Sequence, residues 1–578
     1  MTDRLRTLIS AFEIALATVA SLCFGVSFGH TYGVDNQVVY LLGSLRLLDG
    51  SILQRDWFAT QTTHYHPTFK YLGAALIALD RQGRAVAIAQ TLTITGGILC
   101  VYALLRALCG ARRALPAFLL LLAIASITRT SAPGSTYVFD WILQPSTLGS
   151  VGLLGAAAFF ARGRWLASGL CAAGGGLFHM NYLVLLIMAL GVAHLALGRE
   201  GLVGRLLLQL VPPSLVLFLF LPMLLGATSS PAAAEAQRIT FEIRSPHHYE
   251  PSTFESGFQG SVAWMLLGGA GTLCIATRYA PAARRLAAFI GGLSLVIWAG
   301  IVMSTLVHVP KVTHLFTWRI GPHANLLLQA VACAGAVTVL TDPRSARKAP
   351  TLALMLALGG AGVIGMLYGN RDATALPQVV LGATVAAAVV AFASDAMRTL
   401  GTGTWNARLG RALRQVATPV LLLGALAVFV SATREQLAKY EDRSNVPEGI
   451  RKHEADLCQW MREKSPKEAR FLTPPDLETI RYWGQRAIVV DWKSNPGLPD
   501  EVLEWFRRLK DVTGRPKFSS RKDLAGYDDM DAARLAKLSA QYDVDYAVIR
   551  ARKERALDGY PVVFSNGHYA VLDVRGKR

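Results

Sequence analysis

Long apolar blocks alternate with short polar ones over most of this chain. Apolar runs of about 17 to 25 residues can cross the hydrocarbon core of a bilayer as helices. The expected spans are 8–28, 84–106, 114–128, 143–161, 166–178, 181–197, 206–226, 259–276, 286–308, 321–340, 350–368, 377–395 and 416–432. The pattern predicts a polytopic α-helical membrane protein with about 13 transmembrane helices.

The pattern changes after residue 432. Charged residues become frequent, a helix-like polar stretch occupies 449–461, and short β-rich runs follow at 487–490, 546–549 and 569–574. We therefore expect a transmembrane domain at 1–432 and a small soluble α/β domain at 433–578. The predicted strands are too short and too few for a second large core.

Composition agrees with a membrane protein: 52% of the 578 residues are hydrophobic and only 17% are charged. The formal charge of +19 comes from short basic clusters between apolar runs, without an interleaved aromatic platform. This arrangement argues against nucleic acid as a partner. The seven cysteines include no CxxC or other metal-binding spacing, so neither a disulfide framework nor a redox site is indicated.

The basic clusters also predict a topology. If Arg4 and Arg6 keep the N-terminus in the cytoplasm, alternate loops carry nearly all the other clusters, in accordance with the positive-inside rule. The loops at 29–83 and 227–258 and the whole C-terminal domain then lie on the outer side of the membrane.

The first outer loop has a pattern of its own. From Asp35 to Leu48 apolar residues recur at near-helical spacing, and Asp49 followed by Gly50 supplies a stop signal. An amphipathic helix on the membrane surface fits this pattern, and an ordinary surface helix is the alternative. Asp56, His64, His66 and Lys70 follow before the second span.

This order of residues resembles the GT-C superfamily of membrane glycosyltransferases, which use sugars linked to lipid phosphates. Asp35 matches the acidic residue after the first span of that family, Asp56 matches its second acidic residue, and residues 65–68 (Tyr-His-Pro-Thr) resemble its His-Pro-Pro segment. Here Thr68 replaces the second proline, and no Asp-Glu pair follows Val34. The resemblance implies a GT-C-like transmembrane domain with an outer C-terminal domain.

The resemblance continues for about half of the chain. Asp140 stands where the family often has a further acidic residue, and His179 stands where a lysine or threonine is common. The segments containing Arg481, Asp491-Trp492-Lys493 and Glu504-Trp505 resemble the tail of a bacterial membrane protein group of unassigned activity that also has a Pro-His-His-Tyr loop. Localisation in the bacterial inner membrane, with a periplasmic C-terminal domain, follows as an expectation.

Sugar transfer from a polyprenyl phosphate needs a group that takes a proton from the acceptor and a cation that stabilises the departing phosphate. Asp35 is the candidate base, because partial desolvation at a membrane rim can raise a carboxyl pKa toward the useful range. Its alternative role is the N-cap of the helix that begins at Asn36.

Two outer loops contain candidate phosphate ligands. One offers Arg244, His247 and His248, and the other offers Lys311 and Arg319. Arginine forms paired, charge-assisted hydrogen bonds to phosphate, and protonated histidines can add donors. The alternative is an ordinary solvated loop whose cations meet anionic lipid headgroups.

His64 and His66 share a face if their segment is extended, and Asp56 could complete a site for a divalent cation such as Mg²⁺ or Mn²⁺. Loop packing is the alternative. Lys70 and His179 are further pocket candidates, and for Asp140 and His179 interhelical hydrogen bonding competes with a catalytic role.

The sequence thus predicts an inverting glycosyltransferase in which Asp35, Asp56 and Asp140 are the catalytic candidates. Its expected partners are a polyprenyl-phosphate-linked sugar donor, membrane lipids, and a glycan, lipid or protein acceptor. Two alternatives remain: a lipid or polysaccharide transporter, for which we find no convincing internal repeat, and a noncatalytic assembly protein that uses its outer domain for partner contacts.

Overall fold

We describe a computed structural model of the chain. It describes residues 3–341 and 452–577, apart from short gaps, together with a few positions between 423 and 434. The gaps are at 30, 64–65, 129–131, 135, 251–253, 255–260, 263, 270, 273–279, 308, 552–556 and 558.

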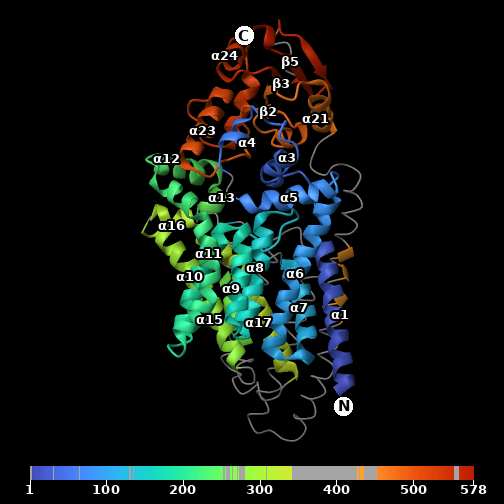
Figure 1. The fold of residues 1–578 in the computed structure, drawn as a ribbon, viewed down its shortest axis with the longest axis vertical. Coiled ribbons are helices and arrows are strands. Elements are labelled where there is room, and N and C mark those ends of the chain that lie inside the picture. The colour runs from blue at the N-terminus through green and yellow to red at the C-terminus, as the bar shows by residue number, and fades with distance from the viewer. Residues whose placement is uncertain are drawn as a thin grey trace, which may run out of the picture.

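Long apolar helices form a bundle below the C-terminal domain (Figure 1). They are α1 (Asp3–Ser27), α6 (Arg84–Cys109), α7 (Ala111–Thr128), α8 (Pro145–Ala161), α9 (Trp165–Phe178), α10 (Met180–Ala196), α11 (Leu202–Ser229), α15 (Ala280–Thr305) and α17 (Gly321–Thr341). Five stretches within the described helices are long and apolar enough to cross a membrane. The predicted polytopic helical class is confirmed.

Nine predicted spans coincide with these helices to within a few residues. The spans at 350–368, 377–395 and 416–432 lie wholly or largely outside the described residues, and the span at 259–276 does so in part. The number of 13 helices therefore stays a prediction.

Small residues allow the central helices to approach closely. A Cβ at Gly152 of α8 would lie 2.5 Å from the Cα of Gly175 of α9. Helices without a large side chain at the crossing can bring their backbones together and gain van der Waals contact, which drives helix association in membranes. A methyl group at either position would force α8 and α9 apart.

The first outer loop folds into α2 (Gln37–Tyr40), α3 (Leu42–Leu48), α4 (Trp57–Gln61) and α5 (Pro67–Leu79). The single helix predicted at 35–48 is thus divided at Leu41, which is buried together with Leu42. The expected stop is confirmed, because α3 ends at Asp49 with an extended backbone. Leu47 and Leu48 keep an exposed apolar edge at the end of α3.

Several short elements complete this end of the bundle. They are α12 (Ala233–Arg238), η1 (Ile239–Arg244), α13 (Pro246–Tyr249), α16 (Pro310–Leu315) and η3 (Thr317–Ile320). Figure 1 shows α12 and α13 between the long helices and the C-terminal domain.

The C-terminal domain combines a five-stranded sheet with helices. Its elements are α21 (Lys452–Lys464), β1 (Arg470–Leu472), α22 (Ile480–Gly484), β2 (Ala487–Ile488), α23 (Pro499–Thr513), η5 (Arg521–Asp529), α24 (Ala532–Tyr542), β3 (Tyr546–Arg550), β4 (Val562–Ser565), β5 (Tyr569–Asp573) and η7 (Arg575–Lys577). The strand order is β2-β1-β3-β5-β4. β1 is parallel to β2 and β3, whereas β5 is antiparallel to β3 and β4.

Alternating side chains give this sheet two buried faces. Phe471 and Val548 pack with residues of α21 on one face, and Leu472 and Ile549 pack with residues of α23 and α24 on the other. This division follows from the two-residue period of a strand. The sequence predicted strands too short and too few for a second large core; in the structure, residues of α21, α23 and α24 pack against the strands and extend the buried apolar clusters.

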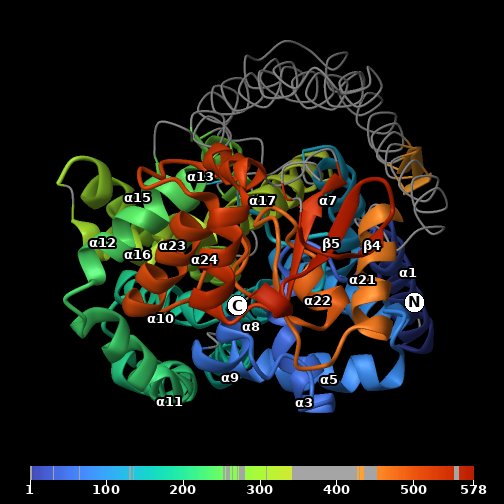
Figure 2. The same ribbon diagram turned by 90° about the horizontal axis from the view of Figure 1, so that it is seen from above.

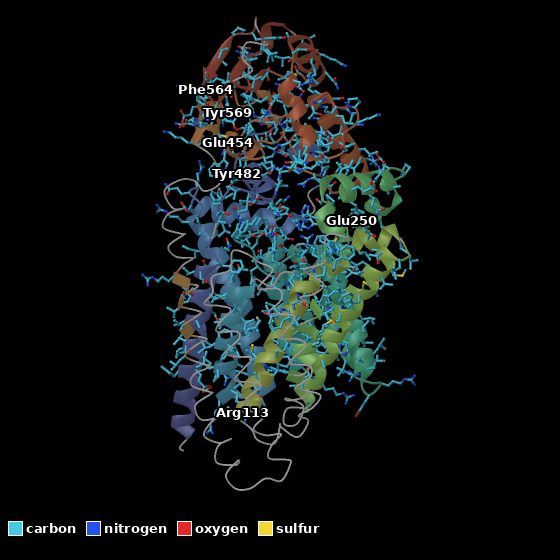
Figure 3. All side chains as sticks on the ribbon, turned by 180° about the vertical axis from the view of Figure 1, so that it is seen from behind. Arg113, Glu250, Glu454, Tyr482, Phe564 and Tyr569 are labelled. Carbon is cyan, nitrogen blue, oxygen red and sulfur yellow. The ribbon has the colours of Figure 1, made fainter. Side chains whose placement is uncertain are left out.

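The C-terminal domain contacts the first outer loop through hydrogen bonds and an ion pair. The Trp483 indole nitrogen donates to the Gly33 carbonyl oxygen at 2.7 Å, and the hydroxyl groups of Tyr32 and Tyr482 are 2.7 Å apart. Arg55 of the loop pairs with Asp545 of the domain at 2.7 Å. Seen from above, the domain covers much of the bundle (Figure 2). Figure 3 shows Tyr482 at the junction and Arg113 at the opposite end of the bundle.

Candidate functional site

Asp35 lies in the loop between α1 and α2, with its backbone in the left-handed region at φ 48°. Aspartate tolerates this conformation better than most residues do, and residues in this conformation cluster at functional sites. The side chain is 48% exposed, and its carboxylate lies 3.7 Å from the Nζ atom of Lys493. Asn36, not Asp35, is the N-cap of α2, and it forms no side-chain cap. The alternative capping role of Asp35 is therefore wrong.

Asp140 lies in the loop that precedes α8. Its carboxylate accepts hydrogen bonds from the Trp141 backbone nitrogen at 2.7 Å and from Gln144 Nε2 at 2.9 Å. Burial and, to a smaller extent, the negative charge of Asp35 raise the pKa of Asp140 to about 6, against the opposing effects of its hydrogen bonds and of Lys493. The two carboxylates are therefore electrostatic neighbours, although the sequence places them a hundred residues apart.

Tyr137, from the same loop, connects this acidic pair with a cation. Burial raises the pKa of Tyr137 to about 12, with contributions in the same direction from Asp140 and Asp35, whereas Arg319 lowers it. One phenol thus lies within electrostatic range of both the candidate base and a candidate phosphate ligand.

Arg319 belongs to η3. This short helix follows Phe316, whose backbone is left-handed at φ 50°. The described contacts of Arg319 are with rings rather than carboxylates. The guanidinium lies 5.3 Å from the Phe316 ring centroid and 6.0 Å from that of Tyr182. A cation whose close neighbours are aromatic faces keeps its capacity to bind an anion.

Arg244 reaches the same region from η1. Its guanidinium lies 5.0 Å from the Trp492 ring centroid, and Trp492 directly precedes Lys493. Burial lowers the pKa of His247, and Arg244 and Lys493 lower it further. Adjacent residues of the C-terminal domain therefore contact Asp35 on one side and Arg244 on the other.

His66 and His248 are neutral at neutral pH. Burial lowers the pKa of each to about 3, and the nearby charge of Arg319 acts in the same direction. Each ring donates its Nδ1 proton to a backbone carbonyl, His66 to Phe178 at 2.9 Å and His248 to Gly134 at 2.7 Å. In a neutral ring the Nε2 atom is then an acceptor. Both rings thus supply hydrogen-bond acceptors and shape, and His248 lacks the positive charge considered for it as a phosphate ligand.

His179 and Lys70 have local partners. His179 is the N-cap of α10, where its Nδ1 atom accepts a hydrogen bond from the Tyr182 backbone nitrogen at 3.3 Å, and its ring lies 5.3 Å from the His66 ring. Lys70 of α5 places its ammonium 4.9 Å from the Tyr71 ring centroid. His179 is thus part of the ring cluster beside Arg319, whereas Lys70 is held at the surface of α5.

Asp56 is a structural residue. It is fully buried and is the N-cap of α4, where it accepts a hydrogen bond from the Ala59 nitrogen at 2.8 Å. The same carboxylate accepts from Arg481 Nε at 2.9 Å and from the Ile488 nitrogen at 3.0 Å. With its oxygens taken up in this way, Asp56 is neither a candidate base nor a metal ligand, and those two expectations are corrected.

Two other predicted site groups cannot be placed. His64 and the side chain of Lys311 lie outside the described residues. Within the described part of the chain, no three His, Cys, Asp or Glu side chains gather as a metal site. A divalent cation therefore stays a prediction from the sequence alone.

Lys493 and Tyr137 are site residues that the sequence did not indicate. The segment around Lys493 resembles other tails, but no local pattern connects it with a loop at the other end of the chain. Tyr137 lies three residues before Asp140, so the neighbourhood of that acid was the one available signal.

Comparisons with known proteins place this geometry in context. Residues 452–512 match a family described as a domain of unknown function (DUF6798). No curated protein matches the chain. The structure is similar to that of ArnT from Cupriavidus metallidurans bound to undecaprenyl phosphate, with a TM-score of 0.50, 17% identity and 97% of each chain covered.

An oligosaccharyltransferase from Archaeoglobus fulgidus, tethered to an acceptor peptide, also matches, with a TM-score of 0.47 and 13% identity. That match covers 93% of this chain and 68% of the other. The near-complete coverage by ArnT shows the architecture of the chain, which is a multi-pass membrane protein with the GT-C fold.

Proposed function

We propose that the chain is an integral membrane glycosyltransferase that moves a sugar from a polyprenyl-phosphate-linked donor to an acceptor at the outer face of the bacterial inner membrane. One observation carries the proposal: Asp35 and Arg319 both lie within electrostatic range of the Tyr137 phenol. The negative charge of Asp35 raises the pKa of Tyr137, and the positive charge of Arg319 lowers it. A proton acceptor and a cation for the leaving group thus lie in one region.

The reaction requires few groups. The acceptor hydroxyl or amide attacks the anomeric carbon, its proton passes to Asp35, and the bond from that carbon to the phosphate oxygen breaks. A single displacement of this kind inverts the anomeric carbon. Asp35 is suited to this role because its side chain is half exposed and lies within electrostatic range of a buried second carboxylate, Asp140.

The departing phosphate gains negative charge, which Arg319 can stabilise. Arg319 lies against aromatic rings, and the neutral histidines His66 and His248 lie within range of its charge. The ArnT structure with undecaprenyl phosphate supports the class of donor through its shared fold.

The arrangement of charges supports the proposed topology. The N-terminus and the C-terminal domain lie at opposite ends of the molecule (Figure 1), and Arg113 lies at the end away from the domain (Figure 3). A cytoplasmic location for the basic clusters then puts the domain and the candidate site in the periplasm.

Transfer by purified protein tests the proposal. The protein is reconstituted in lipid with a panel of undecaprenyl-phosphate-linked sugars and a membrane glycolipid extract, and release of undecaprenyl phosphate is measured. Asp35→Asn should lower turnover by roughly 10²- to 10⁴-fold. Asp49→Asn is the matched control, because Asp49 is an exposed acid of the same loop that pairs with Lys467 away from the site.

Arg319→Met should weaken binding of undecaprenyl phosphate, measured by native mass spectrometry, and should leave binding of neutral lipids unchanged. Full turnover by a folded Asp35→Asn protein, or unchanged phosphate binding by Arg319→Met, would contradict the corresponding assignment.

A further inference from the structure

Two lysines of the C-terminal domain pair with aspartates of the first outer loop. Lys467 lies 3.3 Å from Asp49, and both side chains are about half exposed. Lys493 lies 3.7 Å from Asp35, but only 18% of the Lys493 side chain is exposed. The two pairs have the same chemistry and connect the same parts of the chain, so their surroundings distinguish them.

Lys493 is held by a rigid turn. The Asp491 carboxylate accepts from the Ser494 backbone nitrogen at 2.6 Å, and the Asp491 carbonyl oxygen accepts from the Trp505 indole at 2.8 Å. Asp491 also pairs with the buried Arg481, which anchors the turn to the core of the domain. The backbone of Lys493 is therefore fixed by its neighbours, and the ion pair with Asp35 is not needed to hold it.

The charges around the pair are mixed. Several ionisable groups of other elements lie within electrostatic range of the pair. They are Asp140 and Tyr137 in the loop before α8, Arg244 of η1, His247 of α13 and Glu478 of the C-terminal domain. Arg319 of η3 lies within electrostatic range of Tyr137. Lys493 stabilises the ionised form of Asp140 as well as pairing with Asp35. Two neighbouring carboxylates repel each other, and one tends to take up a proton unless a cation lies beside them.

We propose that Lys493 is the positioning residue for Asp35: its ammonium holds that carboxylate in place, so that the C-terminal domain completes the catalytic centre. This inference rests on the proposed function. It assigns to the soluble domain a part in the reaction itself. In the reaction, the acceptor proton passes to Asp35, and Lys493 neither gains nor loses a proton.

The experiment compares full-length proteins that differ at one lysine. Turnover of the undecaprenyl-phosphate-linked donor is measured from pH 5 to pH 9 for the wild type, Lys493→Met, Lys493→Arg and Lys467→Met. Lys493→Met should lose about tenfold or more at pH 7 and move the acidic limb of the rate profile upward by roughly one pH unit. Lys493→Arg should keep the acidic limb of the pH–rate profile where it lies in the wild type. Lys467→Met should match the wild type both in rate and in the position of that limb.

The inference is overturned if Lys493→Met keeps the wild-type limb, or if Lys467→Met shows the same loss. Lys493→Gln provides a second uncharged variant if the Met protein does not fold. Failure of the proposed function gives a different result, because a folded Asp35→Asn protein would then retain its turnover. An inactive Asp35→Asn protein together with an unchanged Lys493→Met protein overturns the inference alone.

Discussion

Two aspartates of the first outer loop meet cations of the C-terminal domain in opposite ways. Asp56 and Arg481 are both buried and lie 2.9 Å apart, and further hydrogen bonds from Ala59 and Ile488 complete the carboxylate. Asp35 and Lys493 lie 3.7 Å apart at a half-exposed position, with the Asp35 backbone in the left-handed region.

This difference in burial and in hydrogen-bond partners indicates which of the two aspartates can react. A fully buried carboxylate that accepts three hydrogen bonds within the protein is shielded from an acceptor substrate, and loss of its cationic partner leaves an unpaired buried charge. A half-exposed carboxylate beside a single cation keeps an open side for a substrate. The buried pair therefore holds the domain on the bundle, and the half-exposed pair belongs to the site.

The largest expected effect is on the buried pair. Arg481→Met leaves Asp56 and Asp491 buried without their shared cation, which should lower the free energy of unfolding by about 3–5 kcal/mol. Thermal unfolding of the C-terminal domain measures this. Lys493→Met should cost less than about 1 kcal/mol, because its pair is partly exposed. Equal destabilisation by the two variants would remove the contrast.

Next in size is a change in the loop that presents Asp35. Gly33 has φ 69°, and a Cβ there would lie 2.3 Å from the Trp483 ring. Gly33→Ala should cost roughly 1–3 kcal/mol and displace Asp35, so that turnover falls as well. Gly50→Ala is the control, because a Cβ at Gly50 meets open space. Wild-type stability and turnover of Gly33→Ala would show that this contact does not position the loop.

The pH dependence sharpens the role of the second acid. The pKa of Asp140 is raised to about 6, so Asp140 is ionised above that pH. Its negative charge should favour proton uptake by Asp35, and the rate should fall as the pH falls through 6. Asp140→Asn is neutral at every pH, so its profile should lack this step and stay near the acidic rate of the wild type. A wild-type profile in the variant would exclude Asp140 from the pair.

The same pKa has a consequence for stability. Because the folded-state pKa exceeds the ordinary value of 3.8, the protonated carboxyl stabilises the fold at low pH. That contribution is fully present below pH 3.8 and is lost as the pH rises through 6. The free energy of unfolding, measured by denaturant at pH 4 and pH 8, should therefore differ less in Asp140→Asn than in the wild type.

The smallest effect is expected at the ion pair between Lys467 and Asp49. Lys467→Met removes a contact between half-exposed side chains, so unfolding should change by less than about 1 kcal/mol and turnover should stay the same. A large loss in either measurement would show that domain contact alone, without the site, controls activity.

Hydropathy predicted the bundle well because each membrane helix carries its own signal. The C-terminal domain was less predictable: the strands containing Phe471 and Phe564 were missed, since a run of three or four residues has little periodicity of its own. Asp35 was selected from the sequence, but the role of Asp56 was not. Its partner Arg481 lies more than 400 residues away, and such pairing depends on tertiary structure rather than on local pattern.

The most direct test measures two quantities on two isosteric variants. For Asp35→Asn and Asp56→Asn, turnover per folded molecule and the unfolding temperature of the C-terminal domain are determined side by side in lipid. We expect Asp35→Asn to lose turnover and keep the wild-type unfolding temperature, and Asp56→Asn to unfold at a lower temperature while its folded fraction stays active. An active Asp35→Asn protein beside an inactive, fully stable Asp56→Asn protein would contradict the account.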